Sequence, residues 1–292
     1  MKECFKTEIK TLLNMKSISI GLLLLLIIPS YIIYSNYKDA QSQMNYIQII
    51  YDDIQINISE GNEVNTNNID DDIFMIYKTY EPHMAVNNSF IVLIGTGIII
   101  FPIIFSLYIG NEYSRSRIIK TKTVHYSLIQ VFVSKIIVMF LILLLFETIY
   151  TALNIYLIKL YWNKYLAEFF MDYMHVNVIT MSNFIIIALT TFIILFYTMI
   201  CFTISLLFKR SIAGIITTII INFVVLPNKF SFHNMFFDLI NKTFFISEAS
   251  PYMFTLRITE VLPVHIELMI LITFFIMLLG VILFAGLRQK NS

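Results

Sequence analysis

Six stretches of about twenty apolar residues dominate this chain of 292 residues and leave little choice of fold. A helix needs about 20 apolar residues to cross the hydrocarbon core of a bilayer. Only 13% of the residues are charged and 58% are hydrophobic, which is far from the composition of a soluble domain. We therefore predict an all-α membrane protein with six transmembrane helices, at about residues 17–35, 89–109, 129–158, 183–207, 211–227 and 265–287.

The basic residues are distributed unevenly between the segments that join these stretches, and this sets the predicted orientation. With both termini in the cytoplasm, the inner segments carry twelve basic residues and three acids, Glu3, Glu8 and Glu112. The outer segments then carry seven basic residues and most of the acids. Because cytoplasmic loops of membrane proteins are enriched in Lys and Arg, we predict a multi-pass protein of the plasma membrane with cytoplasmic N- and C-termini.

Two segments outside the spans have a distinct character. Residues 1–16 place Phe5, Ile9 and Leu12 on one face of a helix, with lysines beside them. This pattern is typical of an amphipathic helix at a membrane surface, so we predict an interfacial helix on the inner leaflet. Residues 36–88 are rich in Asn, Asp and Ser and form the predicted large extracellular loop.

The third span, residues 129–158, carries the polar side chains of greatest interest. Lys135 lies near its cytoplasmic end, where a long side chain reaches the headgroups. Glu147 is twelve residues further along, about 18 Å deeper, and Thr151 and Asn154 continue a polar stripe on the same face. An acid at that depth faces a bundle interior, a partner or water. Two interpretations carry equal weight, namely a protonated Glu147 bonded to a neighbouring helix and a contribution to a substrate path.

Known catalytic and cofactor motifs are absent from the sequence. The five histidines are scattered without metal-ligand spacing, and Cys4 and Cys201 form no C-x-x-C pair. There is no G-x-x-x-x-G-K-[ST] motif to hold ATP phosphates. The net charge of +1 gives no reason to expect nucleic-acid binding. We therefore predict a chain that is not itself an enzyme and holds no metal or cofactor.

The cytoplasmic segment after the second span differs from the other inner segments. It is short and strongly polar, and it contains neither Pro nor a Gly-rich turn, so a charged surface helix is expected there. Such a helix would suit docking to a soluble partner. The candidate contact residues of this predicted coupling segment, residues 112–126, are Glu112, Tyr113, Arg115, Arg117, Lys120 and Lys122.

The run Gly110-Asn111-Glu112-Tyr113-Ser114-Arg115-Ser116-Arg117, continued to Ser134-Lys135, resembles the signature loop of ABC-2-type transporter permeases. Glu112 and Lys135 match its acidic and basic ends, while Ser116 and Arg117 stand where the family has a Gly-Thr pair. The resemblance implies a single permease domain over residues 1–292 that forms a homodimer, or a heterodimer with a sister permease, in the lipid bilayer. It further implies a separate ABC ATPase subunit that binds ATP and Mg and docks on the coupling segment.

Together these observations favour the membrane subunit of an ATP-driven exporter in a bacterial plasma membrane. Its expected cargo is amphipathic, such as a peptide, a lipid-linked molecule or a drug. The polar face at Glu147, Thr151 and Asn154 is the candidate translocation path. The alternatives are a proton-coupled secondary transporter that uses Glu147, or a membrane sensor or immunity protein.

Overall fold

A computed structural model describes residues 2–59, 67–110, 128–173, 182–223, 235–236, 238–239 and 263–290. Within these ranges the chain contains helices and no β-strand, which confirms the predicted all-α fold class for the described part. The elements are α1 (Lys2–Leu13), α2 (Lys16–Ser59), α3 (Asn67–Tyr80), α4 (Pro82–Gly110), α6 (Leu128–Tyr165), the 3₁₀-helix η2 (Ala167–Tyr173), α7 (Asn183–Phe208), α8 (Ser211–Phe223) and α10 (Val264–Lys290).

Five of the described helices are long and apolar enough to cross a membrane, namely α2, α4, α6, α7 and α10. The predicted fifth span, residues 211–227, corresponds to α8, whose described part has 13 residues. At 1.5 Å per residue, that part measures about 20 Å, less than the hydrocarbon thickness of about 30 Å. The described residues therefore support a membrane-embedded helical protein with five candidate spans, while residues 224–227 of the predicted fifth span lie outside them.

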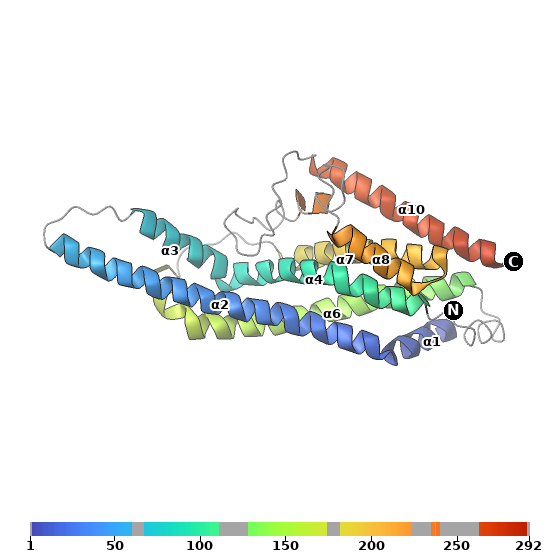
Figure 1. Ribbon diagram of the computed structural model, residues 1–292, viewed down its shortest axis with the longest axis horizontal. Helices are drawn as coiled ribbons and strands as arrows, with labels where there is room; N and C mark the ends of the chain where they lie inside the picture. Colours follow the sequence, from blue (N-terminus) through green and yellow to red (C-terminus); the bar gives the residue numbers. More distant parts are fainter. Residues whose placement is uncertain are drawn as a thin grey trace.

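The bundle has central and peripheral helices (Figure 1). In the most apolar part of α4 and of α7, 61% of the residues are buried, compared with 28% in α2 and 22% in α10. Within the apolar part of α2, residues 20–28, and along α10 the exposed residues are largely apolar, as expected of a lipid-facing surface. α4 and α7 thus form the core against which α8, α2, α6 and α10 pack.

Small residues allow the central helices to approach closely. A Cβ atom added at Gly97 of α4 would lie 2.6 Å from Cδ1 of Ile194 on α7, so a larger residue would displace the Ile194 side chain from its position between the two helices. Gly214 of α8 is packed in the same way against the hydroxyls of Ser205 and Ser106. Close contact through small residues is a common mode of helix association in membranes. The sequence element Gly95-Thr96-Gly97 uses only its second glycine, because Gly95 faces open space.

The helix that begins in the predicted first span does not end at the polar boundary near residue 36. α2 continues without interruption to Ser59, about 66 Å in all, and α3 packs against it to form a helical hairpin within the predicted outer loop (Figure 1). Residues 36–59 contain neither Gly nor Pro, so nothing local breaks the helix. Buried Tyr37, Ala40 and Met44 supply the stripe that faces the bundle.

Aromatic side chains surround the base of this hairpin. The Tyr37 hydroxyl donates a hydrogen bond to the Tyr80 backbone carbonyl at 2.9 Å. The Tyr34 and Tyr161 rings lie 5.5 Å apart, and Tyr77 lies 6.1 Å from Trp162. Tyr and Trp gather at membrane–water interfaces in this way. The hairpin therefore begins where an apolar bundle would leave the bilayer.

Candidate functional site

The predicted coupling segment lies outside the described residues, and with it Glu112, Tyr113, Arg115, Arg117, Lys120 and Lys122. The structure does place the residues on either side of that segment. α4 ends at Gly110, where an added Cβ would lie 2.5 Å from the Cβ of Ser211 at the start of α8. α6 begins at Leu128, at the same end of the bundle as α1 (Figure 1).

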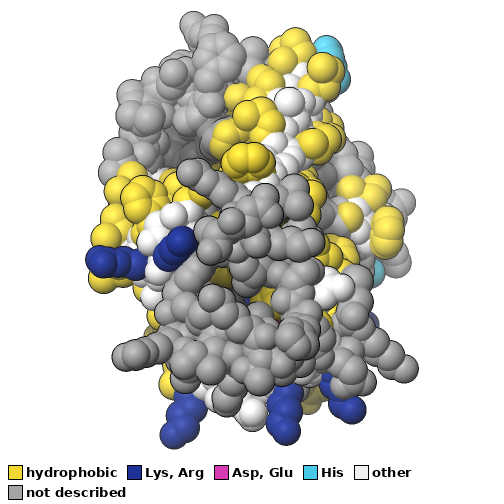
Figure 2. All heavy atoms as spheres, turned by 90° about the vertical axis from the view of Figure 1, so that its right-hand side faces the viewer, with side chains coloured by type: hydrophobic (Ala, Val, Ile, Leu, Met, Phe, Trp, Pro, Cys, Tyr) yellow, Lys and Arg dark blue, Asp and Glu magenta, His cyan; other side chains and the backbone are white. Residues whose placement is uncertain are grey.

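This end of the bundle is basic. The exposed charged residues there include Lys6 and Lys10 of α1, Lys16 at the start of α2, and Lys209 and Arg210 in the turn between α7 and α8. Figure 2 views the molecule from this end and shows several Lys and Arg side chains, with no acidic side chain visible among the coloured residues. The acids of the described hairpin lie at the opposite end.

The turn between α7 and α8 is held by local backbone geometry. Lys209 adopts a left-handed conformation with φ of 55°, and its N–H donates to the carbonyl of Leu206 at 3.3 Å. The N–H of Arg210 donates to the carbonyl of Ser205 at 3.1 Å. These bonds satisfy the last carbonyls of α7, and the two cations lie near the negative end of its dipole. The C-terminus of α7 therefore favours the positive charges of Lys209 and Arg210, which belong to the basic end of the bundle.

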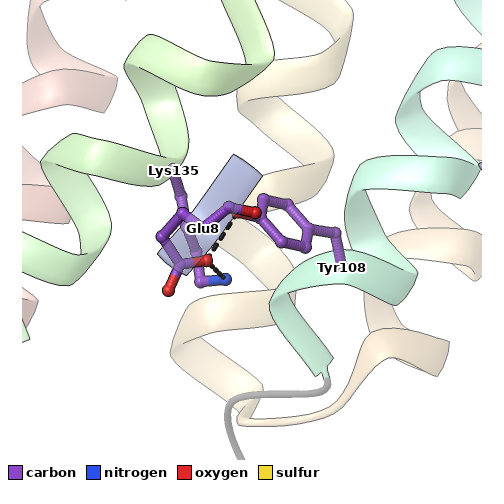
Figure 3. A network of polar contacts seen from close by, with 3 residues as sticks. All are labelled: Glu8, Tyr108 and Lys135. Atoms are coloured by element: carbon purple, nitrogen blue, oxygen red, sulfur yellow. Dashed lines mark hydrogen bonds and ion pairs between the residues drawn. The ribbon is translucent and has the colours of Figure 1, made fainter. Parts of the chain in front are cut away.

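A buried polar cluster joins three helices at the basic end (Figure 3). Glu8 of α1, Tyr108 of α4 and Lys135 of α6 are almost fully excluded from the surface. The Lys135 ammonium donates to Glu8 Oε2 at 2.6 Å, and the Tyr108 hydroxyl donates to the same oxygen at 2.5 Å. The Lys135 Nζ atom also lies 3.5 Å from the centroid of the Tyr108 ring. We call these three residues the inner clasp.

The physical logic of the inner clasp is that each charge compensates the other. A charged group removed from water is stable only when it is paired and hydrogen-bonded. Glu8 is placed for this by helix periodicity, because it lies one turn from Cys4 and one turn from Leu12, both buried. α1 is thus attached to the bundle through apolar contacts on both sides of an ion pair.

The predicted helix at residues 1–16 is present as α1, while the expectation for Lys135 is wrong. Its side chain does not extend to the membrane surface; it has no exposed area and reaches Glu8 instead. The signal was available in the sequence, since Glu8 falls within the apolar face of an amphipathic helix and an acid in that position requires a partner. Sequence alone did not indicate which of the distant cations would supply it.

Cys4 lies one turn before Glu8 and is also buried. Burial raises the pKa of the Cys4 thiol above its usual range, and the Glu8 carboxylate contributes in the same direction. The nearby hydroxyl of Ser134 on α6 opposes this shift only in part. The thiol is consequently less reactive than a free cysteine, which makes it a useful reporter of how tightly α1 is held.

A second polar cluster lies deeper in the bundle, on the predicted third-span stripe. Glu147 is fully buried, and the Thr191 hydroxyl of α7 donates to its Oε2 atom. No hydrogen-bond partner of the Glu147 Oε1 atom occurs among the described residues. Thr151 donates to the Glu147 backbone carbonyl at 2.7 Å. The structure therefore realises the helix-to-helix contact that was one of the two interpretations of Glu147.

The remaining stripe residue, Asn154, is buried as well. Its Nδ2 atom donates to the Tyr150 carbonyl at 2.8 Å, and its Oδ1 atom has no partner among the described residues. The Tyr150 hydroxyl crosses to α4 and donates to the Ser89 carbonyl at 2.8 Å. We call Glu147, Thr151, Asn154 and Thr191 the midspan cluster. It presents two unused acceptor atoms inside the apolar bundle.

Neither cluster resembles a metal centre or a catalytic site. Over the part of the chain that the structure describes, no three His, Cys, Asp or Glu side chains lie close enough together to hold a metal ion. The inner clasp and the midspan cluster consist of buried hydrogen bonds and one ion pair. Such contacts hold helices together and change when the helices move.

Comparisons with known proteins add no relative to this description. A scan against models of protein families finds no match, and neither the search of curated proteins nor the search of solved structures finds one.

Proposed function

We propose that this chain is the membrane-embedded permease subunit of an ATP-driven ABC exporter of the ABC-2 type, working with a separate ATPase. The observation that carries the proposal is the basic end of the bundle. The two residues that flank the coupling segment, Gly110 and Leu128, lie there with α1 and the exposed cations of α1, α2 and the α7–α8 turn. A charged face that borders the coupling segment is what docking to a soluble ATPase requires.

The same asymmetry supports the proposed orientation. Exposed Lys6, Lys10, Lys16, Lys209 and Arg210 mark one end, while the hairpin at the other end is acidic. Under the positive-inside rule the basic end faces the cytoplasm. In this arrangement α1 lies at the inner surface, both termini are cytoplasmic, and the α2–α3 hairpin projects from the outer surface of the plasma membrane.

In the proposed mechanism, the ATPase moves the coupling segment when it binds ATP, and the inner clasp makes α1, α4 and α6 follow together. Rigid attachment matters because a loosely held helix would not transmit the movement. Two such chains, identical or related, would enclose the route of an amphipathic cargo, with Glu147 and Asn154 of the midspan cluster supporting it.

The test is purification of the full chain from its native membrane, followed by measurement of ATP hydrolysis in the purified sample. We expect hydrolysis to co-purify with the wild-type chain and to be lost in Glu112→Lys and Arg115→Glu, which alter the coupling segment. Lys159→Glu is the matched control, since it reverses an exposed charge near the opposite end of α6, away from the basic end. Transport that continues in vesicles containing this chain and no ATPase would contradict the proposal.

A proton-coupled transporter is the second candidate, and the midspan cluster is the observation that favours it. Glu147 is fully buried and its Oε1 atom accepts no bond from any described residue, which leaves one oxygen available to a proton. Uptake that follows the proton gradient without ATP and is abolished by Glu147→Gln would select this candidate. ATP-dependent transport that survives the same substitution would exclude it. A sensor or immunity protein would show neither activity.

A further inference from the structure

The hairpin formed by α2 and α3 contains a pocket of about 330 Å³ that neither polar cluster uses. Its walls come from one face of each helix. α2 contributes Tyr46, Ile47 and Ile50, and α3 contributes Asp72, Met75 and Ile76. The i, i+3 and i+4 spacings on each helix place these residues side by side. The lining is thus largely apolar, with one carboxylate at its edge.

The pocket is open and continues into an exposed apolar surface. Tyr46 is 65% exposed although its ring lines the pocket, and Ile49 and Ile56 further along α2 are 60% and 57% exposed. All three lie beyond the aromatic residues at the base of the hairpin, outside the apolar bundle. Apolar side chains gathered on a solvated hairpin mark a contact surface. We call the pocket and its margins the hairpin groove.

Acids predominate around the hairpin groove, and the nearest lysines, Lys38 and Lys78, lie toward the base of the hairpin. From Asp39 to Tyr77 the sequence contains eight acids and no Lys, Arg or His. The described acids Asp52, Asp53, Asp71 and Asp72 are all exposed. A surface of one sign raises the local concentration of oppositely charged ligands and speeds their association. The groove therefore combines an apolar floor with a negative field.

We propose that the hairpin groove binds a cationic amphipathic peptide, with its apolar side chains in the pocket and its cations toward the acids. A helix with apolar residues at i, i+3 and i+4 is the form that lies in such a groove. The inference rests on the proposed function in one respect only, since it needs the hairpin to lie outside the membrane. It does not need the ATPase.

The charge pattern argues against the other occupants. An anionic lipid surface would be repelled by the acids, and a neutral apolar ligand would gain nothing from them. A second copy of this hairpin would bring acids against acids, because residues 39–77 carry no cation to pair with. Only a ligand that is both apolar and positive is complementary to the floor and the rim together.

The experiment measures binding of a synthetic peptide to the full chain in nanodiscs of zwitterionic phosphatidylcholine. The probe is a fluorescein-labelled peptide with Leu at helical spacing and Lys on its other face. The comparison peptide has Glu in place of each Lys, and empty nanodiscs give the background. We expect the Lys peptide to bind above background, the Glu peptide not to bind, and the affinity to fall as salt is raised, since the Debye length shortens from about 10 Å at 0.1 M to about 3 Å at 1 M.

Two pairs of variants locate the site. Asp72→Asn should weaken binding about threefold, the effect of one exposed ion pair, while Asp71→Asn should change it little, because its side chain points about 100° away around α3. Tyr46→Ala should weaken binding about fivefold or more, as loss of an aromatic anchor does. Tyr51→Ala is its control, about 140° around α2 from Tyr46. Circular dichroism checks that each variant remains helical.

Three outcomes would overturn the inference. They are equal binding of the Glu peptide, equal effects in the groove variants and their controls, and crosslinking between copies through Gln43→Cys in the pocket wall, which would place a second chain there. Binding is measured without an ATPase, so it survives if the exporter proposal fails. Conversely, if ATP hydrolysis co-purifies with the chain but the groove variants bind the peptide as the wild type does, the peptide-binding inference fails and the exporter proposal stands.

Discussion

Two buried carboxylates, Glu8 and Glu147, are held in opposite ways. Glu8 at the basic end accepts bonds from the Lys135 ammonium and the Tyr108 hydroxyl. Glu147 in the midspan cluster accepts one bond from Thr191, and no cation contacts it among the described residues. One acid is stabilised as half of an ion pair, and the other by a neutral hydroxyl.

The difference follows from what each contact has to hold. α1 is a short helix with a basic outer face, and among the described elements its main contacts are with α6, α2 and α4. The Glu8–Lys135 pair joins residues 127 positions apart in the chain. Glu147 joins the long helices α6 and α7, each of which also packs against α4 and α10. The strong, directional contact thus attaches a short helix, whereas the neutral bond joins two helices that further elements hold in place.

Breaking the ion pair should have the largest effect. Lys135→Met keeps the length of the side chain and leaves the Glu8 carboxylate buried without its cation, so we expect a loss of about 3–5 kcal/mol of unfolding free energy. The measurement is unfolding in detergent titrated with SDS, followed by circular dichroism. The double variant Glu8→Gln with Lys135→Met should recover most of the loss, because no uncompensated charge remains. A single variant within about 1 kcal/mol of wild type would show that the pair is not buried in solution.

Removing the tyrosine hydroxyl should have a smaller effect. Tyr108→Phe keeps the ring against Lys135 and deletes one hydrogen bond to a charged acceptor, which corresponds to about 1.5–3 kcal/mol. Tyr150→Phe is the matched control, since its hydroxyl donates to the neutral carbonyl of Ser89 and its loss corresponds to about 0.5–1.5 kcal/mol. The same unfolding titration compares them. Equal losses would mean that the charge on Glu8 adds nothing to the bond.

The midspan acid should tolerate neutralisation. Glu147→Gln retains an oxygen that accepts the Thr191 bond, and no cation loses its partner, so we expect a change within about 1 kcal/mol. Glu8→Gln measured alongside should cost more, since it removes the carboxylate that forms an ion pair with the buried Lys135. If the two substitutions proved equally harmful, Glu147 would have a cationic partner and the contrast between the two sites would disappear.

The last prediction concerns the rate at which Cys4 is alkylated. This labelling reports how tightly α1 is held and itself deletes no contact of the inner clasp. Because the pKa of the Cys4 thiol is raised by burial, little thiolate forms at pH 8, and alkylation of Cys4 should be slow and should accelerate only above the usual cysteine range. A Cys201→Ala background isolates the signal. Lys135→Met should increase the labelling rate by releasing α1, whereas Glu147→Gln should leave it unchanged. Fast labelling of the unmodified clasp at pH 8 would contradict a tightly held α1.

Much of the fold was predictable because hydropathy reports directly on the solvent that each residue requires. α7 covers Asn183–Phe208 where the sequence predicts 183–207, and α10 covers Val264–Lys290 where it predicts 265–287. The end of α2 was not predictable in this way. Hydropathy falls near residue 36, but helix continuity depends on local propensity, and neither Gly nor Pro occurs before Ser59.

The candidate sites were likewise predictable only in part. Periodicity placed Glu147 and Asn154 on one buried face, and the depth of Glu147 indicated that it needs a partner. It did not identify Thr191, because any neighbouring helix with a hydroxyl would satisfy the rule. The Glu8–Lys135 pair was missed for a related reason. A lysine near the end of a span can extend to the surface, and only the position of α1 decides otherwise.

The unbroken length of α2 has a mechanical consequence. From Tyr37 to Ser59 the helix extends about 33 Å beyond the aromatic base, and it contains no hinge residue over that distance. Its one proline, Pro29, lies within the apolar part, where the missing backbone N–H creates a point of weakness. The helix from Pro29 to Ser59 is about 45 Å long, so a pivot of about 10° at Pro29 would displace its tip by about 8 Å. The hairpin and the inner half of α2 are therefore the two arms of one lever.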